Sequence, residues 1–168
     1  MGRLFPPVPA LVLLAALGCT SHRFSQGVFA KDGVRYRVGE LSRSWRPLEV
    51  DSNDVAYASN DSPHSLAVNS TCQPTGDASL EVLTGHLLIG FTDREKVSEE
   101  KKPLDGRDSL RSRYKARLDG VPVEMMLVVM KKDGCVYDFT YLSPPGRFDE
   151  KRQSFERVLA EFHAEAAP

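Results

Sequence analysis

The histidines are the first place to look for chemistry, because imidazole serves both as a metal ligand and as a general base. The sequence has four of them, His22, His64, His86 and His163. None has a second ligand at helical or strand spacing, so a zinc site would have to be assembled from distant parts of the chain. Ser65 follows His64 directly, but adjacent residues on a strand point to opposite faces, so a hydrolase built on this pair is the least favoured alternative.

Sequence motifs typical of enzymes are absent. The chain has no Gly-x-Ser-x-Gly, no phosphate-binding glycine loop, no dinucleotide fingerprint and no Cys-x-x-Cys. Its net charge of -1 at pH 7 removes the electrostatic argument for a nucleic-acid partner. We therefore expect no catalytic residues, no metal, no cofactor and no nucleic acid, and we expect that the protein is not an enzyme.

A row of cations is the one surface pattern in the sequence. Alternation places four of these side chains on one face of one strand, with a fifth close by: Arg111, Arg113, Lys115 and Arg117, then Arg107. One interpretation is a face that binds an acidic partner or lipid headgroups. The other is an edge strand that carries positive charge to avoid aggregation, with Lys115 pairing across the strands with Glu124.

The first cysteine closes a segment that is typical of export. Residues 1–18 have a single charge, Arg3, and an apolar run from Leu11 to Leu17, as in a secretory signal peptide. The segment Ala16-Leu17-Gly18-Cys19 resembles the lipobox of bacterial lipoproteins, although Ala16 and Leu17 are exchanged relative to the usual pattern. The resemblance implies a lipid on Cys19 and a mature chain that starts there. An ordinary secreted protein is the alternative.

The other two cysteines, Cys72 and Cys135, form a possible disulfide in an oxidising compartment. Two buried free thiols are the alternative. After Cys19, residues 19–27 are polar and are expected to form a tether, followed by one globular domain over residues 28–163.

The elements of this domain are predicted mainly by Asp-Gly pairs, which favour two-residue hairpin turns. Asp119-Gly120 and Asp133-Gly134 predict a three-stranded antiparallel meander between Leu110 and Leu142, with Leu118 opposite Val121 and Cys135 opposite Lys132. The middle strand is apolar on both faces, so both faces of the sheet need cover. Lys31-Asp32-Gly33 predicts a further hairpin.

The remaining segments are assigned from periodicity and breakers. One helix is expected from Asp77, as N-cap, to Phe91, and a closing helix is expected to begin at Asp149. The charged segment from Thr92 to Lys102 is expected to be a connector or a mobile loop, and residues 163–168 are expected to fray. Trp45 precedes Arg46-Pro47 and is expected to fill one end of the core, or to line a ligand pocket.

This order of elements resembles the Mog1/PsbP-like fold, a group that includes small bacterial lipoproteins of the DcrB kind. The resemblance covers residues 28–163. It rests on the lipobox, the first hairpin, Trp45 before a proline, the two helices, the meander and the turn Leu104-Asp105-Gly106-Arg107. It implies an α+β fold, an antiparallel sheet between helices in an α/β/α sandwich, used as an accessory or binding module.

The first functional hypothesis is therefore a lipid-anchored protein of the cell envelope that faces the periplasm and binds another envelope protein. Binding would use the basic strand or the segment from Thr92 to Lys102. The second hypothesis is a periplasmic small-ligand binding domain with a pocket near Trp45.

Overall fold

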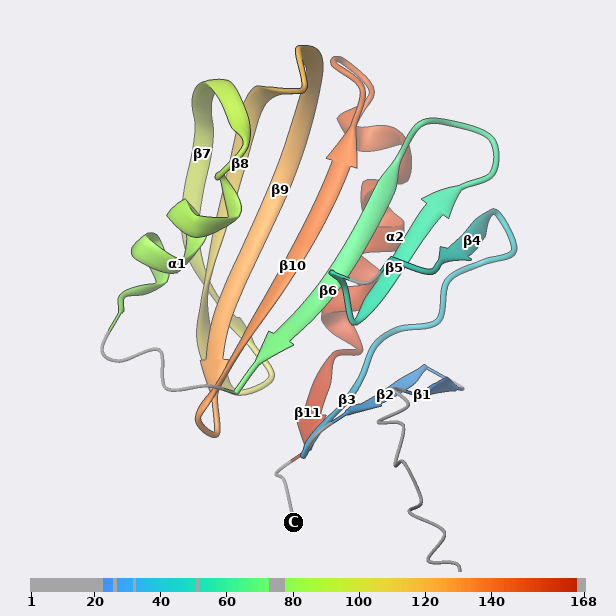
Figure 1. The fold of residues 1–168 in the computed structure, drawn as a ribbon, viewed down its shortest axis with the longest axis vertical. Helices are drawn as coiled ribbons and strands as arrows, with labels where there is room; N and C mark the ends of the chain where they lie inside the picture. Colours follow the sequence, from blue (N-terminus) through green and yellow to red (C-terminus); the bar gives the residue numbers. More distant parts are fainter. Residues whose placement is uncertain (1–22, 26, 32, 51, 73–77, 166–168) are drawn as a thin grey trace, which may run out of the picture.

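A computed structural model describes residues 23–25, 27–31, 33–50, 52–72 and 78–165. Within these ranges the chain forms two antiparallel sheets and two helices (Figure 1). The predictions for residues 1–18, Cys19, His22 and Asp77 lie outside the described residues.

The larger sheet has seven strands in the order β4-β5-β6-β10-β9-β8-β7. Their bounds are β4 Trp45–Leu48, β5 Val55–Ser59, β6 Ser65–Thr71, β7 Phe91–Leu104, β8 Arg107–Leu118, β9 Val121–Lys132 and β10 Cys135–Ser143. The smaller sheet has the order β1-β2-β3-β11, with β1 Arg23–Ser25, β2 Val28–Lys31, β3 Val34–Arg37 and β11 His163–Glu165. Figure 1 shows the smaller sheet below β4 and β5, at one end of the larger one.

The predicted meander is confirmed as β8, β9 and β10, in the predicted register. Leu118 pairs with Val121 and Cys135 pairs with Lys132. Both central residues of each turn have positive φ, from 50° at Asp119 to 79° at Gly134, as this turn type requires. The hairpin of β2 and β3 is also confirmed, because Lys31 pairs with Val34.

The prediction of a loop from Thr92 to Lys102 is wrong. This segment is the main part of β7, the edge strand of the larger sheet, and nearly all of its side chains are exposed. Because neither face of β7 is buried, its sequence has no apolar alternation from which a strand could be recognised. The turn into β8 is another Asp-Gly pair, Asp105-Gly106, with φ of 49° and 74°.

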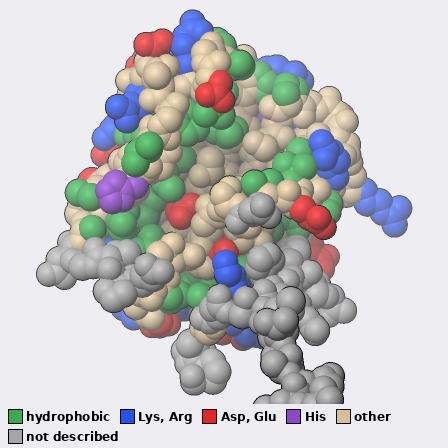
Figure 2. All heavy atoms as spheres, viewed as in Figure 1, with side chains coloured by type: hydrophobic (Ala, Val, Ile, Leu, Met, Phe, Trp, Pro, Cys, Tyr) green, Lys and Arg blue, Asp and Glu red, His purple; other side chains and the backbone are tan. Residues whose placement is uncertain are grey.

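Helix α1, Leu80–Leu87, is shorter than predicted. It begins after Ser79, whose side-chain oxygen accepts a hydrogen bond from the backbone N–H of Val82, and Phe91 already belongs to β7. The helix lies on the face of β8 and β9 that is turned to the viewer in Figure 1. Figure 2 shows hydrophobic side chains gathered around α1, which His86 marks.

Helix α2, Phe148–Ala160, covers the other face of the larger sheet (Figure 1). It begins after Arg147, so Asp149 lies in the first turn and is not the N-cap that the sequence suggested. Phe155 and Leu159 of α2 are buried against the aromatic side chains of β10, such as Phe139 and Tyr141. With α1 on one face and α2 on the other, the α+β sandwich is confirmed.

Both ends of the domain extend beyond the predicted bounds. Strand β1 lies inside the segment predicted as a tether, and it pairs with β2. Residues predicted to fray form β11, in which Ala164 pairs with Tyr36 of β3 and is buried. Backbone pairing with β2 holds β1 in place, and backbone pairing with β3 holds β11 in place.

The disulfide between Cys72 and Cys135 is confirmed, with the two Cα atoms 4.1 Å apart. Cys72 follows β6 and Cys135 begins β10, and these strands are neighbours in the larger sheet. The bond therefore joins two paired strands at one end of the sheet.

Candidate functional site

A hollow lies where β2 of the smaller sheet faces β4 and β5 of the larger one. It has a volume of about 480 Å³ and is lined by Phe29, Pro47, Leu48, Glu49, Val50, Asn53, Asp54, Val55, Ala56 and Tyr57. Phe29 comes from β2 of the smaller sheet, and the other residues come from β4, β5 and their connection. We call this hollow the inter-sheet cleft.

A second, smaller hollow adjoins the cleft. It has a volume of about 150 Å³ and is lined by Gly27, Gly39, Glu40, Leu41, Trp45 and Tyr57. Tyr57 contributes to the lining of both hollows. We call the smaller one the Trp45 hollow.

Trp45 is placed as the sequence suggested. Its side chain is 5% exposed and belongs to the main hydrophobic core, and it also lines the Trp45 hollow. The indole N–H is buried and has no acceptor among the described residues.

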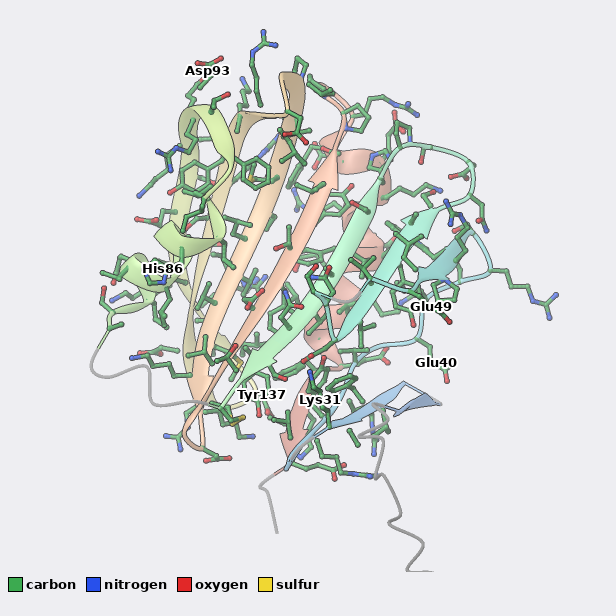
Figure 3. The ribbon with its side chains drawn as sticks, in the orientation of Figure 1. Lys31, Glu40, Glu49, His86, Asp93 and Tyr137 are labelled. Carbon is green, nitrogen blue, oxygen red and sulfur yellow. A yellow bond between two sulfur atoms is a disulfide. The ribbon has the colours of Figure 1, made fainter. Side chains whose placement is uncertain are left out.

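The charged residues that line the two hollows are all acidic: Glu49 and Asp54 in the cleft, and Glu40 in the Trp45 hollow. Glu40 and Glu49 are exposed, and Figure 3 shows both on the side of the molecule where β4 faces the smaller sheet. Burial, together with the charge of Glu40, raises the pKa of Tyr57.

The carboxylate of Asp54 is held in place by the two sheets together. Tyr36 of β3 donates its hydroxyl to Asp54 Oδ2 over 3.3 Å, and the hydroxyl of Ser70 in β6 donates to the same oxygen. Burial, with the charge of Asp54 next in size, raises the pKa of Tyr36 well above its usual value. Tyr36 therefore stays protonated as a donor.

Asn69 connects the backbone of Asp54 to a second carboxylate, that of Asp138. Its side-chain oxygen accepts hydrogen bonds from the backbone N–H of Asp54, at 3.2 Å, and from Asn53 Nδ2, at 3.0 Å. Its Nδ2 donates to Asp138 Oδ1 of β10 over 2.9 Å. Burial raises the pKa of Asp138 to about 6, although the bond from Asn69 acts in the opposite direction, and the charge of Asp54 raises it further.

The basic strand is placed differently from the expectation of a docking face. Its alternating cations do share one face of β8, but this is the face that α2 covers. Arg111 is 7% exposed and its Nη1 lies 3.0 Å from Glu156 Oε2 of α2. Arg113 lies 2.7 Å from Glu124 Oε2, and its guanidinium stacks 3.9 Å from the centre of the Phe148 ring. Arg111 is therefore paired with α2, and Arg113 is held between Glu124 of β9 and the Phe148 ring of α2.

The other members of the basic face lie nearer to the surface. Arg117 pairs with Asp93 at 3.1 Å, and Arg107 pairs with Asp133 at 3.7 Å. Both arginines and Lys115 are exposed. Lys115 does lie opposite Glu124 in the strand register, as expected. The carboxylate of Glu124, however, accepts from Arg113 and from the backbone N–H of Gly146, at 2.9 Å, so the predicted ion pair gives way to a buried one.

The histidine of the suggested hydrolase pair contacts Ser62, not Ser65. His64 is 1% exposed, its Nε2 lies 3.0 Å from the carbonyl oxygen of Arg147, and its Nδ1 lies 2.9 Å from Ser62 Oγ. Because a carbonyl only accepts, Nε2 carries the proton and Nδ1 accepts from Ser62. A serine hydroxyl hydrogen-bonded to a histidine ring nitrogen is also part of the catalytic triad of serine hydrolases.

The surroundings of Ser62 indicate a structural role. Its hydroxyl also lies 3.1 Å from Ser59 Oγ and 3.2 Å from Asp61 Oδ1, and Asp61 in turn pairs with Lys151 of α2 at 2.8 Å. Neither of the two hollows described above includes Ser62 or His64. The contacts tie the turn between β5 and β6 to the start of α2.

The remaining described histidines are far from one another in the fold. His86 lies in α1, and His163 of β11 contacts Asp105 at 2.8 Å. Within the described ranges, no three side chains among His, Cys, Asp and Glu are placed to hold a metal ion together.

Comparison with solved structures finds the same arrangement of elements in proteins of very different sequence. The cyanobacterial PsbP protein (CyanoP) of Synechocystis sp. PCC 6803 superposes with a TM-score of 0.58, at 18% identity, over 92% of this chain and 99% of that one. The domain has the Mog1/PsbP-like fold. A variant of the protein Mog1 has the same fold, with a TM-score of 0.53 at 12% identity, over 80% of this chain and 91% of Mog1.

A third protein with the Mog1/PsbP-like fold is LpqN of Mycobacterium tuberculosis, which is described as involved in cell envelope biogenesis. Its TM-score is 0.54 at 13% identity, over 82% of this chain and 87% of LpqN. No protein-family model and no curated protein matches the sequence significantly. Structural similarity at sequence identities this low establishes the fold alone, so the function has to be argued from the site.

Proposed function

We propose that this protein is a non-catalytic binding protein of the cell envelope, and that its ligand occupies the inter-sheet cleft. The observation that carries the proposal is the cleft itself, with a volume of about 480 Å³ and a lining of apolar side chains beside Glu49 and Asp54. Ligand sites are typically concave and mostly apolar, with a few polar groups that fix orientation. The cleft fits this description.

Three observations support a location in the envelope. The segment that ends at Cys19 resembles a lipoprotein signal, which would anchor the chain in a membrane by its lipids. The disulfide between Cys72 and Cys135 is typical of an oxidising compartment such as the periplasm. LpqN, which has the same fold, is described as involved in cell envelope biogenesis. Among the described residues, no helix is both long and apolar enough to cross a membrane.

Binding of another envelope protein through the basic strand is less well supported than ligand binding in the cleft. Two of the arginines that were expected to dock a partner, Arg111 and Arg113, are occupied by Glu156 and Glu124. The exposed edge strand β7 is the second surface that the sequence suggested. It carries many charges and has register shifts between Thr92 and Glu95 and between Lys96 and Ser98, features that oppose the addition of another strand.

Two measurements test the proposal. Metabolic labelling with a radioactive fatty acid should label the full-length protein in its native cells and should fail to label the Cys19→Ser variant. Native mass spectrometry of the protein purified from those cells should show a retained small molecule. A soluble, unlabelled protein would contradict the membrane anchor. A protein of bare polypeptide mass that also binds nothing in a metabolite screen would contradict the binding role.

A further inference from the structure

We propose that the inter-sheet cleft and the Trp45 hollow together recognise an organic cation, in particular an alkylammonium group. This inference rests on the proposed function, which it narrows to one chemical class of ligand. Three features of the site carry it: the sign of its charges, the aromatic side chains in its walls and its size.

The charges select the sign of the ligand. The ionisable carboxyl groups on the walls are those of Glu40, Glu49 and Asp54, and neither lining includes a lysine or an arginine. An anionic ligand would add a like charge to this site, whereas an ammonium group would offset the charges already there. Glu40 and Glu49 are exposed at the surface and can turn toward a ligand, whereas Asp54 is held by Tyr36 and Ser70.

The walls suit a cation that is attached to an apolar stem. Phe29 and Tyr57 line the cleft, and Trp45 and Tyr57 line the adjoining hollow. Phe29 and Trp45 are buried, so the half-buried Tyr57 offers the most accessible of these rings, and aromatic ring faces attract cations. Beside the rings, Leu48 and the 41% exposed Val50 offer an apolar surface to an alkyl chain.

The size of the site sets a further limit. A volume of about 480 Å³ lies in the lower part of the usual range for ligand pockets, so the ligand is a small molecule or a single side chain.

The test uses intrinsic fluorescence, because Trp45 is the only tryptophan in the chain. The probes are n-butylammonium and ethanolammonium as cations, butyrate as the anion and n-butanol as the neutral analogue. The peptide Gly-Lys-Gly with blocked ends serves as a cationic side chain. We expect the ammonium probes to bind at least about tenfold more tightly than butyrate and n-butanol. Raising the ionic strength should weaken their binding.

Matched variants assign the effect to the cleft. Glu40→Gln combined with Glu49→Gln should weaken ammonium binding about tenfold, because two exposed carboxylates at the site lose their charge. Glu95→Gln combined with Glu100→Gln changes the net charge equally, on exposed positions of β7 that line neither hollow. This control should leave binding unchanged.

Each outcome has one meaning. Tighter binding of the free ammonium probes supports a small-molecule ligand, and tighter binding of Gly-Lys-Gly supports a basic side chain of a partner; both support the inference. Equal binding of cation, anion and neutral analogue, or equal weakening by both double variants, overturns the inference and leaves a binding cleft in place. If no probe binds and native mass spectrometry finds no retained molecule, the proposed function fails as well.

Discussion

Asp105 and Lys132 form a largely buried ion pair within the larger sheet, with Asp105 Oδ2 2.6 Å from Lys132 Nζ. Asp105 lies in the turn between β7 and β8, and Lys132 ends β9, so both belong to the larger sheet. The same carboxylate accepts from the backbone N–H of Ala164, at 2.8 Å, and contacts His163, both in β11 of the smaller sheet. Through Asp105, the smaller sheet is held in the position that forms one wall of the cleft.

Asp105→Asn should therefore destabilise the protein by about 2 to 4 kcal/mol, because Lys132 would lose its charge partner in a poorly solvated site. Asp133→Asn is the matched control: it makes the same change in a turn residue with similar φ, in an exposed pair with Arg107. It should cost less than about 0.5 kcal/mol. Urea denaturation at pH 7 measures both, and equal costs would contradict the role given to Asp105.

The same pair predicts a pH dependence. Burial raises the pKa of Asp105, but the bonds from Lys132, Ala164 and His163 outweigh burial and lower it below the usual 3.8. A carboxyl group with a lowered pKa in the folded state stabilises the fold above its unfolded pKa, and this contribution is lost as the pH falls through the folded value. The difference in stability between the wild type and Asp105→Asn should therefore shrink below pH 4.

Asp138 should act in the opposite sense. Its pKa is raised from 3.8 to about 6, so between these values the folded state binds a proton that the unfolded state has released, and stability falls as the pH rises. Asp138→Asn can still accept the hydrogen bond from Asn69 and carries no charge. The variant should be more stable than the wild type by about 1 to 3 kcal/mol at pH 7.5 and equal to it near pH 4. A gain that does not depend on pH would contradict this account.

The buried arginines of β8 should matter for folding. Arg113→Ser leaves the buried carboxylate of Glu124 without its charge partner and should cost about 2 to 4 kcal/mol. Arg111→Ser removes a buried side chain that packs under α2 and should cost about 1 to 3 kcal/mol. Lys115→Ser and Arg117→Ser, at exposed positions of the same strand, should cost less than about 0.5 kcal/mol. Thermal melts of the four variants would settle this. Neutral effects at Arg111 and Arg113 would reopen the strand as a docking face.

The disulfide should contribute measurably to stability. Removing it through Cys72→Ser and Cys135→Ser together should cost about 2 to 4 kcal/mol, since the bond closes a long segment between residues 63 positions apart. The wild type should lose the same amount on reduction, and the double variant should not respond to reductant. A wild type that is equally stable with and without reductant would contradict this expectation.

The parts of the fold that local chemistry decides could be predicted from the sequence. Asp119-Gly120 and Asp133-Gly134 each specify a turn by their backbone preferences, and the turn then sets the register of the strands on both sides. Asp105-Gly106 carries the same signal and predicts a turn, but the strand before it, β7, is so highly charged that it was predicted as a loop. Strand β11 is too short for any periodicity and forms by pairing with β3.

The candidate site could be predicted only in part. Trp45 was recognised as a residue that could line a pocket, but the acidic partners around it come from connections whose positions depend on how the two sheets pack. The shared face of Arg111 and Arg113 followed from alternation along the strand. The partner of Arg111 could not be predicted in this way, because Glu156 lies 45 residues away from it in the sequence. Contacts of this kind are fixed by tertiary packing.

The most direct test of the binding site is a titration of the isotope-labelled protein with n-butylammonium, followed by the chemical shifts of the backbone amides. We expect the shifts to concentrate on Glu49, Val50, Asn53, Asp54 and Tyr57, with the indole N–H of Trp45 moving at the same ligand concentrations. Shifts concentrated on α1 or β7, with the cleft unaffected up to saturation, would contradict the account.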